Sequence, residues 1–262
     1  MITLLSAYGN HSNRLFQMIH FEAYAKENKR KFITICFDDM YEIYGLKCHP
    51  LRNKLVFFLF RVLRKLKLYT QLDFDADEHF EEYTKRLSKE KISFVSGWYF
   101  RRNDLTIKYR EYFKNKYSIA DKYIINNNFV NTVLKKANDE KIIGVHIRRG
   151  DYKIWQDGKY YFSDEIYLNF INKIKEVLFK NELKPKFIIF TNGDIEIKES
   201  DEIKISHEEW YVDHYLMSKC DYLIGPPSTF TSWASYIGKV PLLFIDSKDM
   251  NFTLKDFKVI DG

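Results

Sequence analysis

Cysteine and long apolar runs are both scarce in this chain of 262 residues. Cys36, Cys48 and Cys220 are widely spaced and odd in number, so the sequence supports neither a disulfide framework nor a thiolate zinc site and favours a reducing compartment. A helix that spans a bilayer needs about 20 apolar residues. Because the apolar run 56–60 is bounded by basic residues on both sides, the sequence excludes an integral membrane protein.

A signal peptide and a glycine-rich phosphate loop are also missing from the sequence. Residues 1–7 lack the basic lead and the full apolar segment that direct secretion, and they predict a buried strand instead. These features predict a cytoplasmic protein.

Apolar and aromatic residues are abundant, at 45% and 17% of the chain. Such a composition excludes disorder and low complexity, and the length allows one large domain or two smaller ones. Lys and Arg number 42 against 36 Asp and Glu, which gives a net charge of +6. This excess suits a small anionic ligand or an acidic membrane surface, and it is too diffuse to require nucleic acid.

Short apolar runs alternate with helix-like stretches in the first half of the chain. Strands are predicted at 2–7, 31–37 and 93–100, and a helix at 13–28. The segment 135–141 is charged and carries no apolar run, so we predict a domain boundary there, with domains 1–138 and 139–262.

The second half has a clearer pattern of continuous apolar strands alternating with helices. Strands are predicted at 142–147, 186–191, 222–225 and 242–245, and helices at 163–179, 209–220 and 229–237. This alternation indicates an α/β fold with a parallel sheet covered on both faces. Ligands of such sheets bind beyond the carboxyl ends of the strands, so the residues that follow each strand are the candidates for function.

The segment 51–69 is basic and amphipathic. It fits either a half-buried helix with a solvated basic face or a helix that lies on anionic lipid. The second alternative predicts a peripheral contact with the inner face of a membrane.

The strongest cluster of reactive side chains follows the strand 142–147. His146, Arg148, Arg149 and Asp151 bring an imidazole, two guanidiniums and a carboxylate to one strand end. Alternation along a strand places His146 and Arg148 on the side opposite to residue 147, and a glycine at 150 permits a sharp turn. Two arginine forks suit a pyrophosphate, although an ion pair of either arginine with Asp151 is the structural alternative.

Two carboxylates in the second half are further candidates. Asp194 lies in a polar turn after the strand 186–191, where ordinary turn chemistry explains it as well as ligand contact does. Asp213 shares a helical stripe with Trp210 and Met217, and a carboxylate on an apolar face needs a donor partner. The two adjacent N–H groups of guanine fit that need, while a protein donor or the dipole at a helix start are the alternatives.

A second candidate anion site lies where the strand 222–225 ends and the next helix begins. Ser228 and Thr229 open that helix, whose first N–H groups and partial positive charge attract anions. An ordinary N-cap explains the same residues.

Together these motifs resemble the fucosyltransferase superfamily of the GT-B type, most nearly the α-1,2-fucosyltransferases of glycosyltransferase family 11. The His-x-Arg-Arg-Gly-Asp-Tyr run at 146–152 is similar to the first motif of that superfamily. Looser matches cover 190–194 and 213–233. Asn-Arg-Leu-Phe-Gln at 13–17 is similar to the family's Gly-Asn-Gln-x-Phe-Gln element, with serine in place of the glycine and arginine in place of the first glutamine.

The resemblance implies two Rossmann-like domains whose parallel sheets face across a cleft, with the acceptor side in 1–138 and the GDP-sugar side in 139–262. It implies donor contacts by Arg148, Arg149, Asp194, Asp213, Ser228 and Thr229, and acceptor-side positions at Asn13 and Arg14. In this scheme Arg148 holds the β-phosphate, Arg149 supports the loop or the acceptor, and Asp213 reads guanine.

The implied reaction is an inverting transfer of L-fucose from GDP-β-L-fucose to a hydroxyl of a glycan, with an α-1,2 linkage. Arg148, His146 and Asp151 are the candidate catalytic residues, and the base stays unassigned among His146, Asp151, His11 and Glu22. No metal or other cofactor is expected, because the Asp-x-Asp sequence at 73–75, with a further aspartate at 77, fits a surface loop.

Two alternatives stay open at this point. Another GDP-sugar would use the same guanine and phosphate contacts, and a non-catalytic module would bind nucleotide or glycan without turnover. In either case the expected partners are a GDP-sugar and an oligosaccharide or lipid-linked glycan, without nucleic acid.

Overall fold

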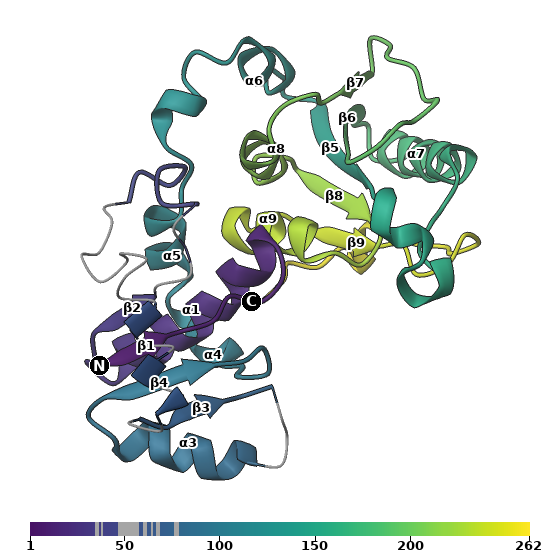
Figure 1. Ribbon diagram of the computed structural model, residues 1–262. Coiled ribbons are helices and arrows are strands. Elements are labelled where there is room, and N and C mark those ends of the chain that lie inside the picture. The colour runs from purple at the N-terminus through teal and green to yellow at the C-terminus, as the bar shows by residue number, and fades with distance from the viewer. Residues whose placement is uncertain are drawn as a thin grey trace. The chain divides into compact units, whose positions relative to one another are not determined.

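The computed structural model describes residues 1–34, 37, 39–46, 58–59, 62–63, 65–66, 69–75 and 79–262. Within them the chain divides into two compact units, one of residues 1–118 with 261–262 and one of residues 119–260 (Figure 1). Much of the basic segment 51–69 lies outside the described residues. Among its described apolar side chains, Phe58, Leu59, Val62 and Leu66 are exposed, and the membrane contact stays a prediction.

The first unit is built on a parallel four-stranded sheet in the order β2-β1-β4-β3. Its strands are β1 Ile2–Leu4, β2 Phe32–Thr34, β3 Gln71–Asp73 and β4 Ser93–Ser96, and its helices are α1 His11–Glu27, α3 Phe80–Lys89, α4 Asn103–Lys108 and α5 Arg110–Lys116. The strand predicted at 93–100 ends early because Gly97 turns the chain at a φ of +102°. A Cβ there would lie 2.5 Å from the Phe74 carbonyl carbon, so only glycine fits this turn.

Helix α1 is buried along most of its length, and its polar residues therefore need partners. The Glu22 carboxylate accepts hydrogen bonds from the hydroxyls of Tyr112 (2.8 Å) and Tyr117 (2.6 Å) and pairs with the Lys116 ammonium. Three donors at α5 thus hold this carboxylate of α1 in place. Glu22 is thus a structural residue, and it leaves the set of candidate bases.

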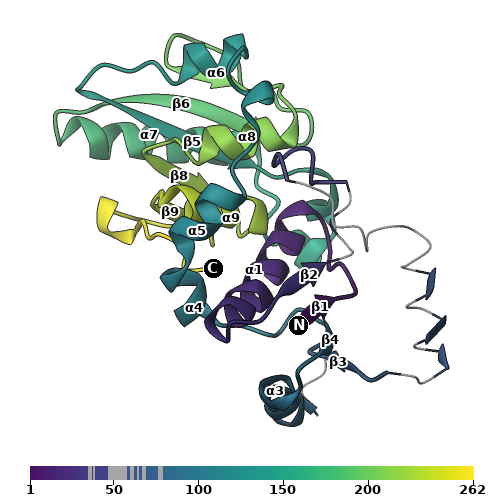
Figure 2. The same cartoon turned by 90° about the vertical axis from the view of Figure 1, so that its left-hand side faces the viewer.

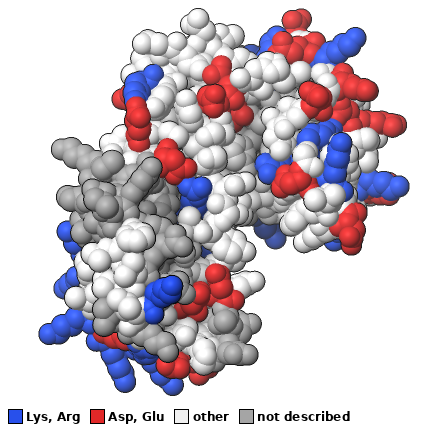
Figure 3. All heavy atoms as spheres, viewed as in Figure 1, with Lys and Arg blue, Asp and Glu red and all other residues white. Residues whose placement is uncertain are grey.

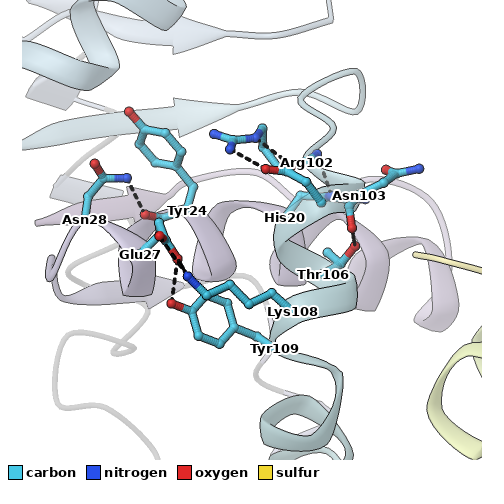
Figure 4. A network of polar contacts seen from close by, with 10 residues as sticks. His20, Tyr24, Glu27, Asn28, Arg102, Asn103, Thr106, Lys108 and Tyr109 are labelled. Atoms are coloured by element: carbon cyan, nitrogen blue, oxygen red, sulfur yellow. Dashed lines mark hydrogen bonds and ion pairs between the residues drawn. The ribbon is translucent and has the colours of Figure 1, made fainter.

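A second polar network joins α1 to α4 (Figure 4). Glu27 accepts from the Lys108 ammonium (2.6 Å) and the Tyr109 hydroxyl (2.7 Å). His20 accepts the backbone N–H of Arg102 at Nδ1 (2.9 Å), and burial lowers the pKa of His20 to about 3, so this imidazole is neutral. These contacts fix α4 against the buried helix.

The second unit contains a parallel five-stranded sheet in the order β7-β6-β5-β8-β9. The strands are β5 Glu140–Ile147, β6 Lys184–Thr191, β7 Ile203–Ile205, β8 Tyr222–Gly225 and β9 Leu242–Phe244, and the helices are α6 Asn128–Val133, α7 Asp164–Phe179, α8 Trp210–Met217 and α9 Thr229–Gly238. Helix α7 covers one face, and α6, α8 and α9 cover the other (Figures 1 and 2). The prediction of a parallel sheet covered on both faces is confirmed.

Along the chain, the boundary between the two units lies at 118/119, whereas the sequence predicts it at 138/139. Apolar packing explains this boundary, because Ile124, Val130 and Val133 are buried in the core of the second unit beside the strands β5 and β6. The charged segment 135–141 is therefore a connection within that unit. At the other end, the carbonyl of Asp261 accepts from the Thr106 hydroxyl (2.9 Å), which joins the C-terminus to the first unit.

Candidate functional site

The carboxyl ends of β5 and β8 carry the main candidate residues. The strands are parallel neighbours, with Val145 opposite Ile224, so the loops that follow them emerge at the same edge of the sheet. Residues 148–152 follow β5, and residues 226–228 join β8 to α9. The Tyr152 hydroxyl donates to the carbonyl of Pro227 and ties the two loops together.

Arg148 lies at this edge with its guanidinium partly exposed. Its Nε and one terminal nitrogen donate to the two oxygens of Asp151, at 3.1 and 3.3 Å, and its guanidinium carbon lies 5.5 Å from the centre of the Tyr152 ring. Gly150 has a φ of +57°, which confirms the predicted sharp turn. Asp151 is mostly exposed, so this pair is weak and the arginine fork can be shared with an anionic ligand.

Arg149 points into the second unit instead. Its guanidinium donates to the Phe162 carbonyl (2.6 Å) and pairs with the Asp164 carboxylate, and both side chains are largely buried. Asp164 also accepts the backbone N–H of Glu196. Arg149 is therefore bound by protein groups that join three loops, and a donor contact of this arginine stays a prediction.

We expect Arg149→Met to lower the free energy of unfolding by about 3 kcal/mol, because it leaves the buried Asp164 carboxylate without its partner. Urea denaturation measures this change. Asp151→Asn is the matched control, since it removes an exposed ion pair and should cost at most about 1 kcal/mol. Wild-type stability of Arg149→Met would contradict the structural role.

His146 is buried and links β5 to α9. Its Nδ1 lies 2.7 Å from the Thr231 hydroxyl oxygen, and burial, reinforced by Arg148, lowers its pKa to about 3. Ile147 lies in the core on the α7 side, so the predicted alternation is confirmed. A buried imidazole with so low a pKa is a weak base, and the geometry gives His146 a role in positioning α9.

Asp213 is a buried carboxylate on α8 with a hydroxyl donor. The Ser206 hydroxyl donates to its Oδ1 (2.5 Å), and burial raises the pKa of Asp213 to about 7, with Glu208 and Glu209 adding to the rise. One hydroxyl does not replace the hydration of a carboxylate, so Asp213 can accept further N–H donors.

Three aromatic rings connect α8, the helix that carries Asp213, to the other candidates. His214 on α8 stacks on Phe230 of α9 at 4.0 Å, and Phe230 lies 5.5 Å from the ring of His146. These contacts join α8, α9 and β5 at the edge of the sheet. The sequence pattern gave no role to Ser206, Thr231, His214 or Phe230. Ser206 directly follows β7, a strand too short and too charged at its flanks to be recognised.

The start of α9 shows ordinary capping. The Ser228 side-chain oxygen accepts the backbone N–H of Phe230 (3.2 Å), and Thr229 is the first helical residue. The Ser228 side chain also hydrogen-bonds to the Tyr152 hydroxyl, whereas the N–H groups of the first helical turn can still meet an anion. The N-cap and the anion site are therefore compatible.

Turn chemistry accounts for the loop after β6. Asn192 accepts the backbone N–H of Arg149 (2.7 Å), and the Thr191 hydroxyl bonds to the backbone of Gly193. Asp194 is exposed beside this turn. The loop supports the position of Arg149, and a donor contact of Asp194 stays a prediction.

The acceptor-side candidates lie in the first unit, on α1. Arg14 donates to both oxygens of Asp39, at 2.8 and 3.0 Å, and to the Gly9 carbonyl (3.3 Å), while Asn13 lies against Gly9. Burial lowers the pKa of the nearby His11. These residues shape the loop between β1 and α1, and they belong to a different unit from Arg148 and Asp213.

The Asp-x-Asp sequence at 73–75 spans the end of β3 and the turn that follows it, where Asp75 is exposed. Asp73 ends β3, Phe74 is fully buried, and Asp75 accepts the backbone N–H of Trp98 (2.5 Å). Within the described ranges, no group of three or more His, Cys, Asp or Glu side chains is arranged to hold a metal ion. No helix in the same ranges is long and apolar enough to cross a membrane.

The family model described as Glycosyl transferase family 11 matches residues 59–255, which is most of the chain. The chain belongs to glycosyltransferase family 11. The predicted membership in the fucosyltransferase superfamily is thereby confirmed, and the family 11 protein is an enzyme of glycosyl transfer. No curated protein matches it.

Solved structures show that the family 11 protein has the predicted α/β fold of the GT-B type. A mutant of Arabidopsis thaliana FUT1 in complex with GDP is 12% identical, with a TM-score of 0.58 over 93% of this chain and 69% of that one. The α-1,6-fucosyltransferase NodZ soaked with GDP-fucose is 14% identical, with a TM-score of 0.54 over 96% of this chain and 97% of that one. At such identities the likeness shows the fold alone.

Proposed function

We propose that this family 11 enzyme transfers L-fucose from GDP-β-L-fucose to a hydroxyl of a glycan, with inversion at the anomeric carbon and an α-1,2 linkage. One observation carries the proposal: α8, which bears the buried carboxylate of Asp213, is joined through the stack of His214 on Phe230 to the start of α9, and Phe230 lies beside His146 on the strand that presents Arg148. GDP and GDP-fucose, the ligands of FUT1 and NodZ, support the choice of donor.

The proposed donor contacts follow from the chemistry of these groups. An ionised Asp213 accepts the two adjacent N–H donors of guanine while Ser206 occupies one of its lone pairs. Arg148 and the N–H groups at the start of α9 meet the diphosphate. Negative charge builds on the leaving phosphate as the glycosidic bond breaks, and preorganised donors at that place lower the barrier. The chain supplies this stabilisation from its own residues.

The proposed base comes from a shorter set of candidates than the sequence allowed. Glu22 is held by three donors, and the low pKa of His146 makes it a weak base. Asp151 and His11 remain as candidates for the general base. A base must come within about 3 Å of the acceptor hydroxyl.

Calorimetry with GDP, GDP-fucose, GDP-mannose and UDP-galactose tests the donor. We expect GDP and GDP-fucose to bind and the UDP compound to fail, because uracil offers the carboxylate one N–H donor where guanine offers two. Proton NMR of the product then gives the linkage and the anomeric configuration. Preference for the UDP compound would overturn the Asp213 contact, and a preference for GDP-mannose would change the sugar.

A further inference from the structure

Tyr8, Trp98 and Arg101 form a partly exposed cluster in the first unit, which we call the aromatic platform. Tyr8 follows β1, while Trp98 and Arg101 follow the neighbouring parallel strand β4. The Tyr8 and Trp98 rings stack with their centres 4.8 Å apart and an interplanar angle of 19°. The Arg101 guanidinium carbon lies over Trp98, 3.8 Å from the ring centre. The platform thus stands at the carboxyl edge of the sheet, where α/β folds bind ligands.

Buried polar contacts hold the platform rigidly. The side chain of Gln17, which is 2% exposed, accepts the backbone N–H of Tyr8 (3.1 Å) and donates to the Gly97 carbonyl (3.0 Å). The backbone N–H of Trp98 donates to Asp75 after β3. Three strand ends are therefore locked together, and little conformational entropy is left to lose when a ligand binds.

Tyr8 remains 40% exposed even though Trp98 supports it, so its ring presents a flat surface to a ligand. Arg101 is half-buried, and no ion pair with a carboxylate is found for it among the residues that the structure describes. Burial lowers the pKa of Arg101 to about 10, which still leaves it charged at neutral pH. A rigid aromatic surface beside guanidinium donors suits a ligand with one apolar face and a rim of oxygen atoms.

We propose that the aromatic platform binds a pyranose ring of the acceptor glycan. One face of a pyranose is lined by C–H groups that pack on an aromatic ring, and its hydroxyls accept hydrogen bonds from a guanidinium. Tyrosine and tryptophan supply such contact area at low entropic cost. The inference rests on the proposed function, because a glycosyltransferase must hold an acceptor, and it names the residues that do so.

The test separates acceptor binding from donor binding in the full-length enzyme. A panel of free oligosaccharides ending in galactose, glucose, mannose or N-acetylglucosamine is assayed for fucose transfer, and the best acceptor is used for kinetics. We expect Tyr8→Ala to raise the KM for that acceptor about tenfold or more, with kcat at saturating acceptor changed much less. The Kd for GDP and the slow hydrolysis of GDP-fucose by water should stay at wild-type values.

Variants with conserved chemistry distinguish recognition from a loss of folding. Tyr8→Phe keeps the ring and should restore the acceptor KM, while Arg101→Met should raise it without affecting GDP binding. Tyr99→Ala is the matched control, since Tyr99 is 55% exposed beside the platform and no stacking contact is found for it in the described residues. An unchanged acceptor KM in Tyr8→Ala, or an equal loss in Tyr99→Ala, would overturn the proposal. Failure of the wild-type enzyme to bind GDP would instead overturn the proposed donor.

Discussion

Replacement of Arg148 by alanine is expected to reduce kcat by about 100- to 1,000-fold, the usual result of removing one donor to charge that develops in a transition state. The melting temperature should barely move, because the side chain is partly exposed and its ion-pair partner Asp151 faces solvent. Arg148→Lys keeps the charge but loses the planar guanidinium, so its kcat should lie between those of Arg148→Ala and the wild type. Steady-state kinetics with GDP-fucose and calorimetric unfolding of the same preparations measure both effects.

Asp151→Asn is the control that separates Arg148 from its neighbour. If Asp151 only pairs with Arg148, the variant should keep a rate within a few-fold of wild type, whereas loss of a catalytic base costs about 100-fold or more. Full-rate transfer by Arg148→Ala would remove the proposed stabilisation of the leaving group.

Binding of GDP-fucose should weaken as the pH falls below 7. Burial holds the pKa of Asp213 near 7, and only the ionised carboxylate accepts both N–H donors of guanine. We expect the Kd to rise about tenfold for each pH unit below that pKa. The diphosphate diester of GDP-fucose does not titrate in this range, so calorimetry between pH 8 and pH 5.5 follows the protein group.

Stability of the ligand-free enzyme should change in the opposite direction. The folded protein retains the Asp213 proton up to about pH 7, whereas an unfolded aspartate releases it near pH 3.8. The contribution of this group to stability is therefore full below the unfolded pKa and declines as the pH rises towards 7.

Asp213→Asn isolates the carboxylate from other titrating groups. It should bind GDP-fucose weakly and with a flat pH profile, since an amide has no proton to lose. At pH 8 the wild-type protein should prefer GDP to inosine diphosphate, which lacks the 2-amino donor, by about tenfold or more, and the variant should not. A steep pH profile in Asp213→Asn would assign the titration to another residue.

Charged side chains of both signs lie on the surface of the second unit. Lys and Arg are interspersed with Asp and Glu on the face of the second unit shown in Figure 3. On that face of the second unit the Lys and Arg side chains are therefore not gathered into a single basic surface.

Periodicity predicted the strands of the second sheet well, because β5, β6, β8 and β9 are continuous apolar runs buried on both faces. It failed for β3 and β7, which have three residues each and lie among charged side chains. Weak periodicity also explains why the predicted domain boundary differs from the boundary between the two units. Residues 119–134 have weak apolar periodicity, and only their packing against β5 and β6 assigns them to the second unit.

The sequence by itself determined the α/β class, the family and the strand end at which Arg148 lies, since these depend on local periodicity and on residues adjacent in the chain. Tertiary structure decided what each polar side chain does. Arg148 and Arg149 are neighbours, yet one pairs with exposed Asp151 and the other with buried Asp164. Desolvation and long-range partners fix such roles, and both arise only when distant segments pack together.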